Sequence, residues 1–118
     1  MTTDSNTHSP RELAELYFTM WNTGDITIAS RILSTDWTDH SHPEVSDPDQ
    51  VKDAVANTRA ARPGLRFEIE TIFVEGDRAC VIGGVGTPDD SGRIVSRLAW
   101  VFRVSDGRPA ELWTYHGA

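Results

Sequence analysis

The stretch Leu65–Gly86, LRFEIETIFVEGDRACVIGGVG, decides the fold, because the chain changes there from a helical to an alternating pattern of apolar residues. Apolar and charged residues alternate from Leu65 to Ile69, which predicts a half-buried strand. The alternation slips by one residue at Thr71, and such a slip predicts a β-bulge. The tetrapeptide EGDR at 75–78 predicts a hairpin turn. Three glycines in the following strand-like run (78–86) predict close neighbours or sharp curvature.

Two more strands are expected after this hairpin, at 94–104 and 110–116, with a turn between them that leaves two registers open. A two-residue turn at Asp106-Gly107 would place Trp113 and Trp100 together on the inner face. A three-residue loop with a glycine bulge would instead turn a different set of side chains inward. That set is Leu112, Thr114 and His116.

The residues before Leu65 predict three helices. Ser9-Pro10-Arg11-Glu12 has the form of a capping box with proline at the first helical position, and apolar residues then recur at helical spacing up to Gly24. A second helix is expected from Asp25, and a third from Asp47-Pro48 to the stop at Pro63-Gly64.

This order of elements predicts an α+β fold, in which three N-terminal helices pack on one face of a curved, mainly antiparallel sheet. The sheet would consist of a four-stranded meander and a short strand near Trp37. Residues 1–8 carry no apolar pattern and are expected to form a flexible tail, so the folded part is a single domain at 9–118.

Composition and charge exclude several classes of function. The net charge is −7 and the eleven Lys and Arg residues are scattered, which argues against a nucleic-acid surface. No apolar run reaches the length of a membrane span and no signal peptide is recognisable, so a cytoplasmic protein without membrane contact is expected. The lone Cys80 lies in a strand-like run and is read as an inert buried thiol.

The segment DWTDHSHPEV (36–45) is the most polar candidate site. His40 and His42 flank one residue, so in an extended strand both would point one way and Asp39 the other. A histidine pair can begin a metal site, but no third ligand stands at metal-site spacing, and we predict no metal and no cofactor. Proton transfer fits better, because an imidazole that titrates near neutral pH is a ready base.

Four stretches together resemble the SnoaL-like polyketide cyclases, which belong to the larger superfamily of ketosteroid isomerase and nuclear transport factor 2. They are LYFTMWNTGD (16–25), DWTDHSHP (36–43), VEGDRACV (74–81) and WVFRVSDGRPAELW (100–113). The resemblance covers residues 10–116 in the right order. It implies a cone-shaped α+β barrel of the cystatin-like or nuclear transport factor 2-like type, with a deep apolar pocket, and a homodimer formed through the sheet.

The resemblance also implies site residues. His40 and Asp39 adjoin the position of the general base in ketosteroid isomerase, and Tyr17 matches the tyrosine that donates to the oxyanion. Trp100 stands where that enzyme has its second oxyanion donor, which puts steroid isomerisation itself in doubt. Many SnoaL-like cyclases carry an essential aspartate after the last tryptophan. This chain has His116 there, which either takes the base role or marks a different chemistry.

The expected catalytic residues are therefore His40, His116, Asp39 and Tyr17. The substrate-binding residues are expected among the tryptophans and apolar strand positions: Trp21, Trp37, Trp100, Leu98, Phe102, Leu112 and Trp113. Two function classes follow. One is a cofactor-free cyclase or isomerase that acts on a polyketide-like or fused-ring ketone. The other is a non-catalytic protein that binds a small hydrophobic or aromatic ligand. An epoxide hydrolase of the same fold is a third possibility, with Arg97 as its arginine.

Overall fold

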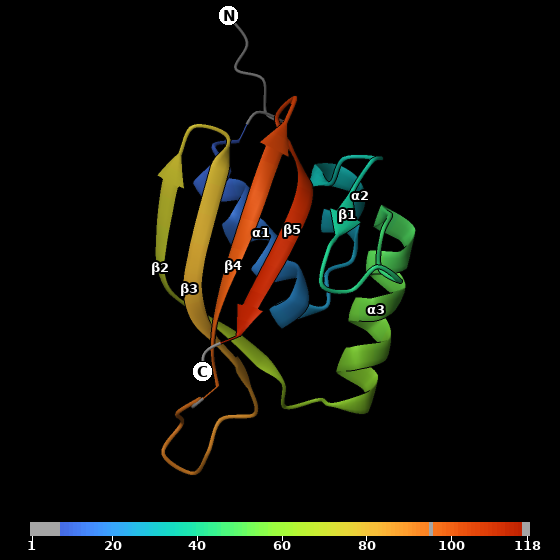
Figure 1. Ribbon diagram of the computed structural model, residues 1–118. Helices are drawn as coiled ribbons and strands as arrows, with labels where there is room; N and C mark the ends of the chain where they lie inside the picture. The colour runs from blue at the N-terminus through green and yellow to red at the C-terminus, as the bar shows by residue number, and fades with distance from the viewer. Residues whose placement is uncertain (1–7, 95, 117–118) are drawn as a thin grey trace, which may run out of the picture.

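The computed structural model describes residues 8–94 and 96–116, which form three helices and one five-stranded sheet (Figure 1). The helices are α1 (Pro10–Thr23), α2 (Thr27–Ile32) and α3 (Pro48–Ala61). The strands are β1 (Thr38–Asp39), β2 (Arg66–Glu75), β3 (Arg78–Gly86), β4 (Arg97–Ser105) and β5 (Arg108–His116). Of the tail expected at 1–8, all but His8 lies outside the described residues.

The sheet has the order β1-β5-β4-β3-β2, with β1 parallel to β5 and the other pairs antiparallel. Helix α1 packs across one face of the curved sheet, and α2 and α3 continue this layer beyond β5 (Figure 1). The α+β fold class expected from the sequence is confirmed. None of the described helices is long and apolar enough to cross a membrane.

Local sequence signals explain the ends of the helices. The Ser9 hydroxyl accepts a hydrogen bond from the Glu12 N–H (3.1 Å) and the Glu12 carboxylate accepts one from the Ser9 N–H (2.8 Å), which completes the predicted capping box. Gly24 ends α1 with φ +81°, a left-handed conformation that glycine adopts without strain. Helix α2 begins at Thr27, two residues after the expected start, because Asp25 uses its carboxylate to accept from the Thr27 N–H (3.2 Å).

The predicted bulge in β2 is present at Glu70, the residue left over between the pairs Ile69–Gly83 and Thr71–Ile82. Gly83 is needed at this place. A Cβ atom on it would lie 1.9 Å from the backbone oxygen of Glu68, so only glycine lets β2 approach β3 so closely.

The β4–β5 hairpin has the two-residue turn of the first predicted register and the strand faces of the second. Asp106 and Gly107 have φ of 53° and 76° and form a two-residue turn, because Ser105 pairs with Arg108. A bulge then follows at Ala110 in β5.

This bulge reverses the faces of β5. The inner face of β5 is therefore the one predicted for a three-residue loop, although the turn itself has only two residues. Leu112, Thr114 and His116 share the concave side with Trp100, and Trp113 lies on the outer side opposite Val101.

Candidate functional site

The concave face of the sheet encloses a cavity of about 350 Å³ between α1, α3 and the loop after β1. Most of its wall is apolar or aromatic: Phe18, Trp21, Val45, Ala54, Leu65, Phe67, Val85, Leu98, Trp100 and Leu112. The polar groups are Tyr17, Asp39, His42, Glu44, Thr58, Thr114 and His116. An apolar hollow with a few convergent polar groups is the usual form of a small-molecule site.

A second hollow, of about 480 Å³, lies along the ends of β2 and β3 and is a poorer candidate. Its charged side chains form ion pairs with one another: Arg97 pairs with Glu70, and the Arg66 Nη2 lies 3.8 Å from the Glu68 Oε2. These four side chains are largely exposed, where ion pairs contribute little. The cavity, in contrast, holds a buried carboxyl group.

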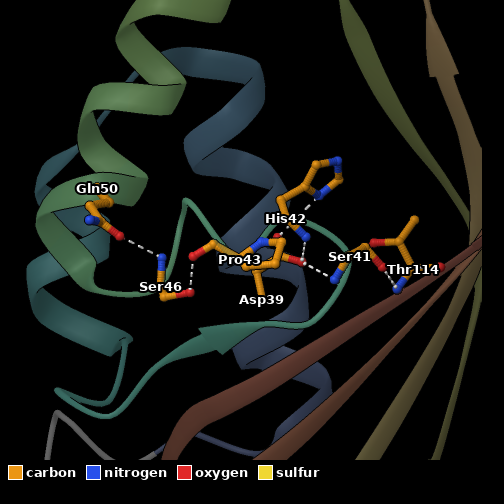
Figure 2. Close-up of polar contacts among 7 residues, drawn as sticks. All are labelled: Asp39, Ser41, His42, Pro43, Ser46, Gln50 and Thr114. Atoms are coloured by element: carbon orange, nitrogen blue, oxygen red, sulfur yellow. Dashed lines mark hydrogen bonds and ion pairs between the residues drawn. The ribbon is translucent and has the colours of Figure 1, made fainter.

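That carboxyl group belongs to Asp39, which is 5% exposed. Strand β1 fixes its direction: Asp39 pairs with Leu112 of β5, and both side chains line the cavity. The Asp39 Oδ1 accepts hydrogen bonds from the backbone N–H groups of Ser41 (3.0 Å) and His42 (3.1 Å) (Figure 2). Because both bonds go to Oδ1, the other carboxylate oxygen of Asp39, Oδ2, is available to a different partner.

His42 is that partner. Its Nδ1 lies 3.5 Å from the Asp39 Oδ2, and its ring stands at the cavity wall with the side chain about half exposed (Figure 2). Burial raises the pKa of the Asp39 carboxyl, and the nearby His42 and the two backbone N–H groups oppose this rise only in part. The site therefore pairs a carboxyl of raised pKa with an imidazole.

The loop that carries His42 is fixed at both ends. The Ser41 hydroxyl accepts from the Thr114 N–H of β5 (3.0 Å), and Gln50 of α3 accepts from the Ser46 N–H (2.8 Å) (Figure 2). Pro43 accepts a further hydrogen bond from the Ser46 hydroxyl. The Asp39–His42 pair is thus held in place by the sheet and by a helix.

Tyr17 supplies the phenol of the site from α1. The residue is 4% exposed, and its ring packs against Phe18, Trp37 and Phe102 at centroid distances of 5.4, 5.6 and 5.2 Å. Burial raises the pKa of the hydroxyl well above its usual value, and the charge of Asp39 adds to this rise. The phenol keeps its proton at neutral pH and can act as a hydrogen-bond donor.

The expectation that His40 faces the cavity is wrong. Because Asp39 points inward beside Leu112, the next side chain must leave on the outer face of the sheet. There the His40 Nε2 lies 2.8 Å from the Glu111 Oε1, and the ring stacks on Trp113 at 4.7 Å between centroids. His40 and His42 do not share a face, because the chain turns between Asp39 and His42 instead of remaining extended.

Three expected substrate contacts also lie elsewhere. Trp37 and Phe102 are 0% and 1% exposed and pack against Tyr17 in the core, behind the cavity wall. Trp113 lies on the outer face, under the Arg78 guanidinium group at 5.1 Å. The bulge at Ala110 explains this position of Trp113.

The other expected site residues meet at the cavity, although their roles stay predictions. They are Tyr17, Trp21, Asp39, Leu98, Trp100, Leu112 and His116. His42 was not among the expected catalytic residues, because an extended strand would have placed it on the same face as His40, whereas the turn brings it to the cavity without His40. Ser41 and Pro43 are turn-forming residues beside Asp39, and they were the signal that the alternation ends there. In the described part of the chain, no three His, Cys, Asp or Glu side chains are arranged to hold a metal ion.

Residues 14–112 match the family model described as the SnoaL-like domain. The chain belongs to this family. Among curated proteins, none matches the sequence. The agreement of the family match with the observed fold confirms the resemblance stated from the motifs.

Solved structures with the same fold are distant in sequence. A SnoaL-like polyketide cyclase from Agrobacterium tumefaciens is 13% identical, with a TM-score of 0.71 over 93% of this chain and 92% of that one. IdmH from Streptomyces antibioticus is 20% identical, with a TM-score of 0.71 over 91% of both chains. An NTF2-like protein of unknown function from Cytophaga hutchinsonii is 14% identical, with a TM-score of 0.74 over 99% and 95%. At these identities the likeness supports the fold alone.

Proposed function

We propose that this SnoaL-like protein is a cofactor-independent cyclase or isomerase that removes a proton next to the carbonyl group of a fused-ring or polyketide-like ketone. One observation carries the proposal: the Asp39 carboxyl is buried in the wall of an apolar cavity, beside an imidazole and near a phenol that keeps its proton. Carboxyl groups of raised pKa in apolar pockets are suited to proton transfer at neutral pH.

The reaction needs a base and an oxyanion donor. Ionised Asp39 takes a proton from the carbon next to the carbonyl group, and the electron pair of the broken C–H bond moves to the carbonyl oxygen. Tyr17 donates a hydrogen bond to the enolate oxygen so formed. The enolate carbon then attacks a second carbonyl group of the same substrate, whose oxygen takes the proton back from Asp39, or a conjugated enolate takes that proton at another carbon. His42 holds the Asp39 side chain in place and exchanges protons with solvent.

The cavity favours an uncharged, flat substrate. Its described lining holds two carboxyl groups, on Asp39 and Glu44, and no lysine or arginine, so an anion would meet no permanently charged cation there. Aromatic walls such as Trp100 and Phe67 suit a ring system. This charge pattern also removes support for the epoxide hydrolase, because Arg97 lies outside the cavity and pairs with Glu70.

The alternative is a binding protein that uses the same cavity without turnover, and a carbon-acid assay separates the two without knowledge of the true substrate. The bicyclic ketone 2-tetralone exchanges its α-protons with D₂O, and NMR measures the rate. We expect the protein to accelerate the exchange and Asp39→Asn to lose about 10²–10⁴ of that acceleration.

Asp36→Asn is the matched control, because Asp36 is an exposed carboxylate in the same segment, and its exchange rate should equal that of the wild type. The rate should also rise with pH as Asp39 ionises, with the inflection above the ordinary aspartate value of 3.8 because burial raises the pKa. If the protein binds 2-tetralone and leaves the exchange at the buffer rate, the enzyme proposal fails and the binding protein stands.

A further inference from the structure

Two indole N–H groups in the described chain are buried without a hydrogen-bond acceptor: Nε1 of Trp21 and Nε1 of Trp37. A buried donor without an acceptor is costly, and natural proteins leave few of them. The two differ in their surroundings. Trp37 is sealed in the core, whereas Trp21 lines the cavity. Only for Trp21 can a bound ligand change the surroundings of the N–H group.

Helix geometry brings Trp21 to Tyr17. The two residues are one turn apart on α1 and line the same cavity. The Trp21 indole is close enough to the Tyr17 hydroxyl to oppose the rise of the phenol pKa, yet its N–H reaches hydrogen-bond geometry with no described acceptor.

The chemistry of the two groups fixes the direction of such a bond. An indole nitrogen can only donate, whereas a phenol oxygen can both accept and donate. If Trp21 donates to the Tyr17 oxygen, the phenol proton must point elsewhere, and the cavity is the space that both residues line.

We propose that Trp21 is a positioning residue, whose indole N–H donates to the Tyr17 hydroxyl when a ligand is bound and so directs the phenol proton at an oxygen atom of that ligand. The inference rests on the donor role of Tyr17 in the proposed function. It identifies the ligand as one with a carbonyl or enolate oxygen over the Tyr17–Trp21 pair. A hydrocarbon of the same shape would lack the acceptor and leave both donors unused.

Binding measurements test the pair independently of turnover. Isothermal titration of 2-tetralone and of tetralin, the hydrocarbon without its carbonyl oxygen, gives the preference for the ketone. Trp21→Phe should weaken the binding of 2-tetralone about threefold to tenfold more than that of tetralin, since both ligands lose the same apolar contact but only the ketone loses the effect of the hydrogen bond. Trp37→Phe is the control, because it removes the other orphaned indole N–H and should preserve the preference.

An NMR readout covers the case in which Trp21→Phe does not fold. In the ¹⁵N-labelled wild-type protein, 2-tetralone should move the Trp21 indole N–H signal downfield, and in Tyr17→Phe that shift should disappear while the Trp37 signal stays in place. A Trp21 signal that moves equally in Tyr17→Phe would overturn the inference. Equal weakening of both probes by Trp21→Phe, or a wild type that does not prefer the ketone, would do the same. None of these three results would affect the base role of Asp39, which the exchange assay measures separately.

Discussion

At the scale of single residues, Asp39 places stability and function in opposition. Burial raises the pKa of its carboxyl, so the folded protein holds this proton to a higher pH than the unfolded chain does. Between the unfolded pKa and the raised folded pKa, the folded state binds more protons, and the free energy of unfolding therefore falls as pH rises. Above the folded pKa the loss is complete. A charged Asp39 at neutral pH is a cost that a catalytic role would explain.

Asp39→Asn should make the protein more stable at pH 7 and inactive in the exchange assay. An asparagine Oδ1 can still accept the N–H groups of Ser41 and His42, but it carries no charge to bury. Thermal melts should show a higher Tm for the variant at pH 7, and no difference below the ordinary aspartate pKa of 3.8, where both side chains are neutral. A wild type that is the more stable at pH 7 would mean that the carboxylate is stabilised, for instance by protonated His42.

At the scale of elements, the sequence predicts those features that depend only on residues close together along the chain. The caps at Ser9 and Asp47, the EGDR hairpin and the bulge in β2 were all predictable, because each is written in residues a few positions apart. The bulge at Ala110 was not. Its sequence signal is weak, and it follows from the packing of β5 on β4 and β1, which join distant segments.

The misplaced site residues have the same origin. A one-residue change of register moves every side chain of a strand to the other face, so the bulge alone decides whether Trp113 or His116 meets the cavity. His40 was assigned to the wrong side because two residues of β1 take their direction from pairing with β5, which local alternation cannot reveal.

Asn22 joins α1 to β2 through Phe67, which lines the cavity, and no local pattern predicted this role. Its side-chain N–H donates to the Phe67 carbonyl oxygen (2.8 Å) and its amide oxygen accepts from the Phe67 N–H (2.8 Å). We expect Asn22→Ala to lower the free energy of unfolding by roughly 2–4 kcal/mol, because both backbone groups lose their partner.

Urea unfolding measures this loss as a lower midpoint at unchanged slope. Asn57→Ala, on an exposed part of α3, is the control and should change stability by less than about 0.5 kcal/mol. Equal stability of the two variants would show that the Asn22 bridge contributes nothing net.

At the scale of the whole molecule, one sheet separates two surfaces. Its concave face encloses the cavity, and its outer face carries two neighbouring rows of mainly apolar side chains. One row runs Phe73, Cys80, Val101 and Trp113 across the strands, and the next runs Thr71, Ile82, Ala99 and Tyr115. Phe73 and Tyr115 are 62% and 56% exposed, so large apolar groups face solvent in the monomer. We propose that a second copy of the chain covers this face.

Phe73→Asp should then convert a dimer into a monomer. Phe73 is exposed in the single chain, so the substitution leaves the core intact, but in the dimer it would bury an unpaired carboxylate. Sedimentation at micromolar concentration should show wild-type dimers and a dimerisation constant at least about a hundredfold weaker for the variant. Ile69→Asp, which changes a 39% exposed residue outside these rows, is the control and should remain dimeric. A wild type that sediments only as a monomer would remove the dimer, and a Phe73→Asp protein that stays dimeric would place the interface on another surface.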